Sequence, residues 1–193
     1  MAMTSLGLQK NNNEGVCPSV SIRLETQEYS SMGQFCMKFA DFVCFEATLP
    51  NQEFTERDDL IRAMVQSLDK VGKLPAGKCQ ELEQAVIDRE NEASTGMGKG
   101  VAVPHVKHPA ITRLVGVVAG CPAGIDFTAL DKQPVFSVIL LLSPVDQPEL
   151  HLQAMEGIFK HIQQEKFRRF LRQCDTVEKM EDLLIEADEN PSW

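Results

Sequence analysis

Residues 98–105 read Gly-Lys-Gly-Val-Ala-Val-Pro-His, in which a glycine-rich loop runs into a short apolar strand. Pro104 has no amide hydrogen to donate to a neighbouring strand, so pairing is expected to stop there. Proline also holds the preceding residue, Val103, in an extended conformation. We therefore predict that His105 stands at the end of a buried strand, beside the loop.

His105 has the chemistry of a phosphoryl acceptor. An imidazole with an ordinary pKa of about 6.5 is mostly neutral at pH 7. Its unprotonated ring nitrogen is a nucleophile toward phosphorus. A histidine that merely faces solvent at the end of a strand would occupy the same position, so position alone leaves both interpretations open.

The loop before this strand, residues 94–100 (STGMGKG), is not a P-loop. It ends in Gly-Lys-Gly instead of Gly-Lys-Ser/Thr, and it precedes a strand instead of a helix. Backbone amides and hydroxyls in such a loop can nevertheless donate to phosphate oxygens, which makes Ser94 and Thr95 candidate phosphate-binding residues. An ordinary tight turn is the alternative interpretation.

Apolar residues at helical spacing predict six helices around this strand. The clearest helix carries a Thr55 cap with Asp58 three residues later, as in a capping box. Another opens at Pro148, near a first turn where proline is tolerated, with Leu152 facing inward and His161 facing outward. The remaining helices are predicted at residues 37–43, from Pro75, at residues 167–171, and from a second capping box at Asp175 and Glu178.

Apolar runs at residues 101–103, 114–119 and 135–142 predict strands that interleave with these helices, and residues 44–49 are expected to be extended as well. This order favours an α/β fold, with a mixed sheet of four to five strands and helices on both faces. The longest apolar run, residues 138–142, is far shorter than the roughly 17–25 residues of a membrane span. We therefore expect no membrane insertion.

The chain of 193 residues carries 28 acidic and 19 basic side chains, for a net charge of −9. This balance argues against nucleic acid or an anionic membrane surface as the main partner. The cysteines form no CxxC and no metal-ligand spacing, which fits reduced thiols in the cytoplasm. His108 follows His105 by three residues but lacks a third ligand, so we expect no metal and no cofactor.

Residues 1–35 are expected to form a poorly ordered N-terminal arm, because they lack sustained periodicity. Residues 1–14 are polar and lack the apolar core of a signal peptide. Within the arm, residues 20–24 alternate apolar and polar side chains, as in a short strand or a docking segment. The expected organisation is this arm, one domain at residues 36–188, and a polar tail at residues 189–193.

Residues 89–105 (RENEASTGMGKGVAVPH) resemble the active-site signature of type-2 IIA domains of the bacterial phosphoenolpyruvate-dependent sugar phosphotransferase system, in the fructose/mannitol/nitrogen-regulatory class. Two later stretches, residues 124–135 and 140–152, are similar to further blocks of that family, in the same order. The resemblance covers roughly residues 38–187 and implies a phosphotransferase/anion-transport-type fold. Lys99 stands where many members have Asn, an exposed difference from which we expect little.

The resemblance implies three catalytic residues. The family's phosphorylated histidine matches His105, its active-site arginine, sixteen positions earlier, matches Arg89, and its second histidine, at the start of a helix, matches His151. Arg89 can fork two oxygens of a transferring phosphoryl group. His151 can donate to another oxygen, aided by the dipole of its helix.

The function implied by this resemblance is that of a phosphoryl carrier. Phosphate would pass from a phosphohistidine on the small carrier HPr, or its nitrogen-branch relative, to His105. It would then move to a IIB domain and on to a sugar, or the phosphorylation state would control a partner protein. Because no IIB or membrane portion fits in the remaining residues, the regulatory branch is favoured. A non-catalytic sensor or scaffold that kept the fold is the alternative of a different class.

Overall fold

The computed structural model describes residues 37–190. The arm predicted for residues 1–35, its alternating segment at residues 20–24, and the last residues of the predicted tail lie outside this range. The domain boundaries therefore stay a prediction.

The sheet is built around β5 (Val135–Ser143), which is paired along both of its edges. The long strand β4 (Val115–Ile125) runs antiparallel along one edge. Two short strands, β2 (Val101–Ala102) and β3 (His105–Lys107), lie one after the other along the other edge, both parallel to β5, and β1 (Gly96–Gly98) pairs antiparallel with β2. The mixed sheet expected from the sequence is thus confirmed, with five strands.

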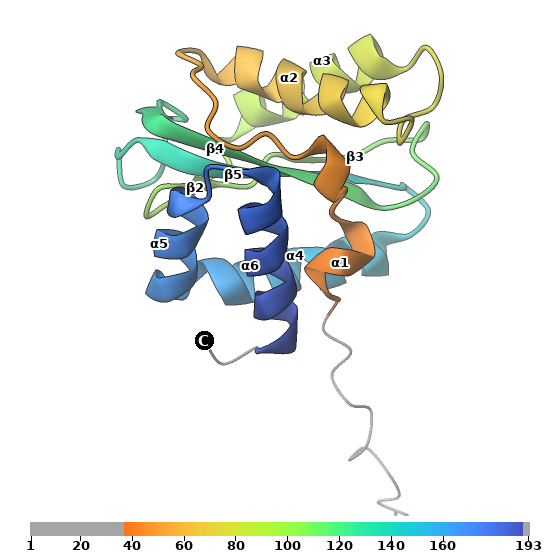
Figure 1. The fold of residues 1–193 in the computed structure, drawn as a ribbon. Helices are drawn as coiled ribbons and strands as arrows, with labels where there is room; N and C mark the ends of the chain where they lie inside the picture. The colour runs from red at the N-terminus through yellow and green to blue at the C-terminus, as the bar shows by residue number, and fades with distance from the viewer. Residues whose placement is uncertain (1–36, 191–193) are drawn as a thin grey trace, which may run out of the picture. The chain divides into compact units, whose positions relative to one another are not determined.

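Helices cover both faces of this sheet (Figure 1). One face carries α2 (Arg57–Lys70) and α3 (Cys79–Glu92). The other carries α1 (Phe39–Phe42), α4 (Pro148–Ile162), α5 (Glu165–Gln173) and α6 (Val177–Glu189). Successive residues of β5 face opposite cores, so its continuous apolar run, residues 138–142, is wholly buried.

The segment before α2 follows the free edge of β4. Isolated bridges join Val43 to Gly116 and Leu49 to Ala119. Between them, Phe45–Ala47 forms a 3-10 turn, the element η1, because the amides of Ala47 and Thr48 donate to the carbonyls of Cys44 and Phe45. The expectation of a continuous extended piece at residues 44–49 is therefore wrong in its middle.

Several predicted helix starts are wrong, although the helices themselves are present. The N-cap of α2 is Glu56, and Asp58 pairs with its neighbour Arg57 at 2.7 Å instead of closing a capping box with Thr55. Pro75 lies in a turn that accepts a hydrogen bond from the amide of Lys78, so α3 begins only at Cys79.

The last helix is also capped differently from the expectation. The hydroxyl of Thr176 accepts from the amide of Lys179 at 3.3 Å and caps α6. Asp175, predicted as the cap, instead accepts from the side-chain ammonium of Lys179 at 2.7 Å. The proline-led start of α4 is confirmed, because Pro148 is the first residue of that helix.

Helix α4 is rotated relative to the prediction. His161 was expected to face solvent, but it is only 4% exposed and lies against the rings of Phe39 and Phe167. Leu152 was expected to face inward, but it is 67% exposed. At about 100° per residue, Leu152 lies roughly 120° around the helix from the buried Ile158, whereas His161 lies roughly 60° from it. Within residues 37–190, no helix is long and apolar enough to cross a membrane.

Candidate functional site

The sequence predicted His105 at the end of a strand, but His105 is instead the first residue of the short strand β3. Strand β2 stops at Ala102, and Pro104 interrupts the ladder because it has no amide hydrogen. The carbonyl of Pro104 still accepts from the amide of Leu141 at 2.9 Å, which keeps the chain against β5. Pairing then resumes with His105 opposite Leu141.

The ring of His105 is held in one tautomer. Its Nδ1 lies 2.8 Å from the carbonyl oxygen of Val103. A carbonyl can only accept, so Nδ1 carries the hydrogen and donates it, and in the neutral ring Nε2 keeps its lone pair. Burial lowers the pKa of His105, and the positive charges of Arg89 and Lys107 lower it further, against opposing effects of the Val103 bond and Glu90. The ring is therefore a neutral nucleophile at pH 7.

His151 is the fourth residue of α4 and lies beside His105. The two ring centroids are 5.4 Å apart and the ring planes are inclined by 45°. Nδ1 of His151 is hydrogen-bonded at 2.8 Å to the hydroxyl of Ser143, the buried last residue of β5. Burial lowers the pKa of His151 to about 4, with further contributions from His105 and Lys107. His151 is thus also neutral at pH 7.

Arg89 approaches from the other face of the sheet, at the last turn of α3. Its Nη1 donates to the carbonyl of Ala93 at 3.0 Å, not to either histidine. Its charge is nevertheless close enough to lower the pKa of His105. The structure therefore brings His105 and His151 into contact and places Arg89 within electrostatic reach of His105.

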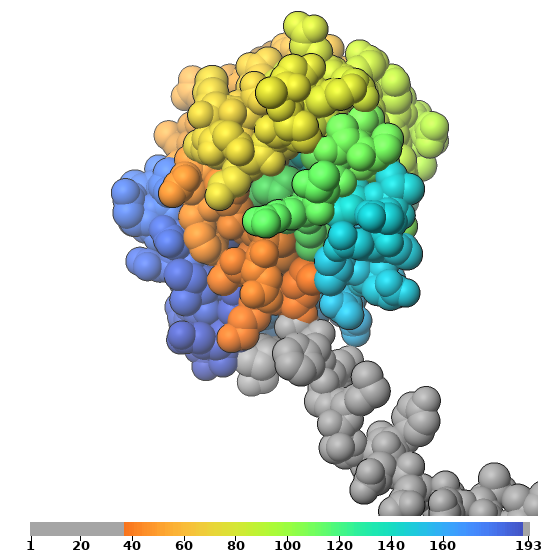
Figure 2. Space-filling model, turned by 90° about the vertical axis from the view of Figure 1, so that its right-hand side faces the viewer, coloured from red at the N-terminus to blue at the C-terminus, as the bar shows by residue number. Residues whose placement is uncertain are grey.

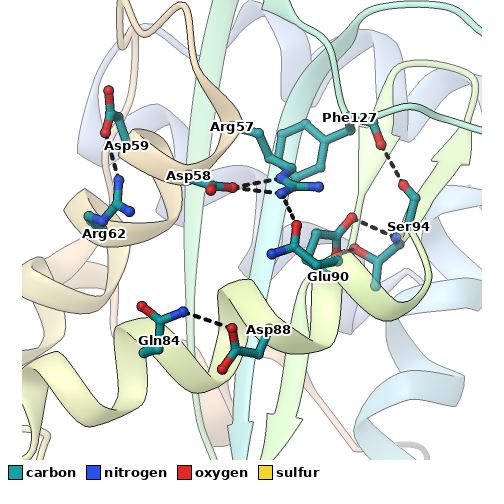
Figure 3. Close-up of polar contacts among 11 residues, drawn as sticks. Arg57, Asp58, Asp59, Arg62, Gln84, Asp88, Glu90, Ser94 and Phe127 are labelled. Atoms are coloured by element: carbon teal, nitrogen blue, oxygen red, sulfur yellow. Dashed lines mark hydrogen bonds and ion pairs between the residues drawn. The ribbon is translucent and has the colours of Figure 1, made fainter.

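The loop before β1 is tied down by its own hydroxyls. Glu90, only 2% exposed, accepts from both the amide and the hydroxyl of Thr95, at 2.7 and 2.6 Å. The hydroxyl of Ser94 donates to the carbonyl of Phe127 and accepts from the amide of Gly96, and Figure 3 shows Glu90, Ser94 and Phe127 around this loop. Phosphate binding by Ser94 and Thr95 stays a prediction, and it requires these bonds to exchange.

Two further residues of the site were missed in the sequence. Lys107 follows His105 by two residues in β3, so both side chains project from the same face of the strand. Lys107 pairs in register with Ser143, the residue that holds His151. The two-residue alternation was the signal available for Lys107, whereas nothing local marked Ser143 as a partner of His151.

His108 is turned away from this site. Its Nδ1 accepts from the amide of Ala110 at 3.2 Å, and its Nε2 lies 3.3 Å from a carboxylate oxygen of Glu81 on α3. Across the described part of the chain, no group of three or more His, Cys, Asp or Glu side chains is arranged to hold a metal ion.

The face that bears the site is shown in Figure 2, where the green segment containing β3 lies between the yellow connection of α2 to α3 and the cyan connection of β5 to α4.

The family model described as "Phosphoenolpyruvate-dependent sugar phosphotransferase system, EIIA 2" matches residues 45–187. The chain belongs to this family. The resemblance inferred from the sequence is thereby confirmed, and the family comprises both nitrogen-regulatory and sugar-specific members.

Relatives of both kinds are similar to this type-2 IIA chain. It is 32% identical over 145 residues to the nitrogen regulatory protein of Klebsiella oxytoca, covering 72% of this chain and 90% of that protein. It is 28% identical over 152 residues to the fructose-specific EIIABC component of Bacillus subtilis, covering 79% of this chain. The match spans only 24% of the length of that larger relative.

Solved structures of type-2 IIA proteins share the fold. The nitrogen regulatory protein IIA-Ntr from Neisseria meningitidis superposes with a TM-score of 0.69 at 22% identity, covering 76% of this chain and 98% of that one. The complex of enzyme IIA-mannitol with phosphorylated enzyme IIB-mannitol from Escherichia coli matches with a TM-score of 0.63 at 21% identity, covering 73% and 95%. At these identities the likeness concerns the fold.

Proposed function

We propose that this chain is a phosphoryl carrier that forms a phosphohistidine at Nε2 of His105. The observation that carries this proposal is the hydrogen bond from Nδ1 of His105 to the carbonyl of Val103, which leaves the Nε2 lone pair unprotonated. Membership of a phosphotransferase-system family supports the same chemistry.

The proposed step is a direct exchange of one nitrogen–phosphorus bond for another. The bond between phosphorus and the donor's histidine breaks, its electron pair returns to that donor nitrogen, and the lone pair on Nε2 of His105 forms the new bond. No proton has to leave Nε2. The phosphorylated ring carries positive charge, and its Nδ1–H then donates more strongly to the carbonyl of Val103, because a charged donor forms a stronger hydrogen bond.

The neighbouring residues would stabilise the phosphoryl group in transit. Its charge is spread over three equatorial oxygens in a loose transition state. Arg89 can fork two of these oxygens, and Lys107 adds a second positive charge. When the hydroxyl of Ser143 donates to Nδ1 of His151, the proton of that neutral ring sits on Nε2, where it can be donated to an oxygen.

The proposed phosphoryl donor is an HPr-like phosphocarrier protein. The proposed acceptor is a IIB domain or, in a regulatory role, a target protein that reads the phosphorylation state. Similarity to a nitrogen regulatory protein over 90% of its length supports the regulatory role. The fold shared with IIA-mannitol, solved in complex with phosphorylated IIB-mannitol, supports a IIB domain as the acceptor. We place the reaction in the cytoplasm, in keeping with the free thiols of the cysteines within residues 37–190, which are Cys44, Cys79, Cys121 and Cys174.

The test is transfer of labelled phosphate from phospho-HPr, and separately from its nitrogen-branch relative. The wild-type chain should acquire a label that is lost in acid and stable in base, and His105→Ala should abolish it. His108→Ala is the matched control, because that histidine lies three residues away and faces Glu81; it should label normally. Labelling of His105→Ala would refute the assignment, and a wild-type chain that takes no phosphate from either donor would favour the scaffold alternative.

A further inference from the structure

A charged cavity of about 430 Å³ lies at the amino end of β5, whereas His105 lies near the carboxyl end of that strand. Its walls are the Lys99–Gly100 turn, the start of β5 and the side of α5. Ser137 lines it, whereas His105 pairs with Leu141, four residues further along the strand. At about 3.3 Å per residue, the two places are roughly 13 Å apart along β5, so this cavity is separate from the phosphohistidine site.

Positive charge is in excess in this cavity, although the chain as a whole has a net charge of −9. Its cations are Lys99, Arg168, Arg169 and Arg172, and its carboxylates are Asp131 and Glu165. This accumulation is local, since the whole chain carries only 19 basic side chains against 28 acidic ones.

Two of these charged groups are already engaged by the backbone. Both oxygens of Asp131 accept from amides, one from Lys99 at 2.7 Å and the other from Gln133 at 3.0 Å. The guanidinium of Arg168 donates to the carbonyls of Ile162 and Gln163, at the end of α4.

The other three cations have no carboxylate partner. Throughout residues 37–190, the side chains of Lys99, Arg169 and Arg172 take part in no ion pair. Three cations without an ion-pair partner therefore share one concave site. The four cations and two carboxylates that line it leave an excess of two positive charges, which a multiply charged anion would neutralise.

The guanidinium of Arg172 stacks on the ring of Phe136. Its guanidinium carbon lies 3.4 Å from the centroid of the Phe136 ring. That ring fits only because residues 100 and 124 are glycines, since a Cβ at either position would lie 2.9 Å or less from side-chain atoms, including the ring of Phe136. A guanidinium stacked in this way keeps its N–H groups free at its edge, in the planar fork that matches phosphate oxygens.

Lys99 occupies an unfavourable backbone position. It forms a two-residue loop with Gly100 between β1 and β2, and both residues have positive φ, 57° and 80°. Such hairpin loops favour Asn, Asp or Gly, because other side chains are strained there. The lysine side chain thus lines the cavity from a backbone position that costs the turn some stability.

From these observations we infer that the cavity binds a small polyanion with two or more phosphate groups. An excess of two positive charges in one pocket matches several phosphate charges better than the single charge of a carboxylate, and the arginine fork fits phosphate oxygens bidentately. The pocket's one aromatic ring, Phe136, already carries Arg172, so recognition rests on the phosphates and not on a stacked base. This binding goes beyond the proposed phosphoryl transfer and does not use His105.

The experiment is calorimetric titration of the full chain with inorganic tripolyphosphate at low salt. The wild type should bind one equivalent saturably, and Arg172→Ala and Arg169→Ala should each weaken binding at least tenfold. Lys166→Ala is the matched control, because it removes one positive charge from the same helix at a residue that does not line this cavity. Circular dichroism checks the fold of each variant.

His105→Ala separates this site from the phosphohistidine site, and it should bind tripolyphosphate as the wild type does. Loss of binding in His105→Ala would place the anion at the phosphohistidine and overturn the inference. So would equal weakening by Lys166→Ala and Arg172→Ala, or no saturable binding by the wild type. None of these outcomes bears on whether His105 accepts phosphate from a carrier protein, because that reaction is measured separately.

Discussion

The side chains at the two ends of β5 differ in their charge. At the carboxyl end, His105 and His151 are both neutral at pH 7, and positive charge comes from Arg89 and Lys107 nearby. At the amino end, Lys99, Arg169 and Arg172 present permanent charge directly to the cavity. The first arrangement offers a lone pair to phosphorus, and the second offers only attraction.

The two proposals together give one sheet two kinds of chemistry. A group that accepts and passes on a phosphoryl must be uncharged and correctly protonated before the reaction, which burial and a fixed hydrogen bond provide for His105. A site that only binds an anion needs neither, so exposed arginines suffice.

Among the residues that surround His105, the largest effect is expected for Arg89→Ala. This change should slow single-turnover transfer from phospho-HPr by about 10²–10³, or roughly 2.7–4 kcal/mol, the usual cost of removing one preorganised charge-stabilising donor. Arg89→Lys should restore only part of the rate, because an ammonium cannot fork two oxygens in one plane. Arg62→Ala is the control, since that exposed arginine of α2 pairs with Asp59. A wild-type rate for Arg89→Ala would remove Arg89 from the site.

A smaller effect is expected when His151 loses its hydrogen-bond partner. Ser143→Ala should slow transfer roughly 2- to 10-fold, corresponding to a neutral hydrogen bond of about 0.5–1.5 kcal/mol. The nitrogen chemical shifts of His151 should at the same time show a change of tautomer. The control is Ser137→Ala, which alters another buried serine of β5, at the other end of the strand. An unchanged tautomer in Ser143→Ala would mean that Ser143 does not position the ring.

The pH dependence of stability should separate His151 from ordinary histidines. The pKa of His151 is lowered to about 4 in the folded chain, against about 6.5 when unfolded. Between these two pH values the unfolded chain binds one more proton at His151 than the folded chain does. The stability that the neutral His151 contributes is therefore fully present above pH 6.5 and is lost as the pH falls toward 4. In urea unfolding from pH 7 to 4.5, His151→Gln should lose less stability than the wild type over this window.

His108→Gln serves as the control for this measurement, since it replaces a histidine that contacts Glu81 outside the pair. If the free energy of unfolding falls with pH equally in the wild type and in His151→Gln, the pKa of His151 is not lowered.

The smallest effect concerns the strained turn at the other end of β5. Lys99→Asn should raise the free energy of unfolding by up to about 1 kcal/mol, because Asn tolerates positive φ better than Lys. The same change should weaken tripolyphosphate binding. Lys132→Asn is matched to it, with a φ of 56° outside the cavity, and should stabilise without changing binding. If both variants bind tripolyphosphate with the same affinity, Lys99 is not part of the anion site.

Much of the fold followed from local pattern in the sequence. The apolar run of β5, the proline at the start of α4 and the interleaving of strands with helices depend on neighbouring residues alone. Errors occurred where a choice was not local. Thr55 was assigned as the cap of α2, but Glu56 is still extended and is the N-cap, so the helix begins two residues after Thr55, at Arg57.

The sequence by itself determined the fold class and the family, and it indicated His105 as the candidate phosphoryl acceptor, because periodicity and motif are properties of contiguous residues. Only the tertiary structure decided which faces meet. It buried His161 under α1 and α5, placed Ser143 against His151, and arranged Lys99 and Arg172 of α5 around one cavity. The physical reason is that hydrophobic spacing specifies an apolar stripe on each element, whereas the packing of two helical layers on one twisted sheet sets the rotation and contacts of each stripe.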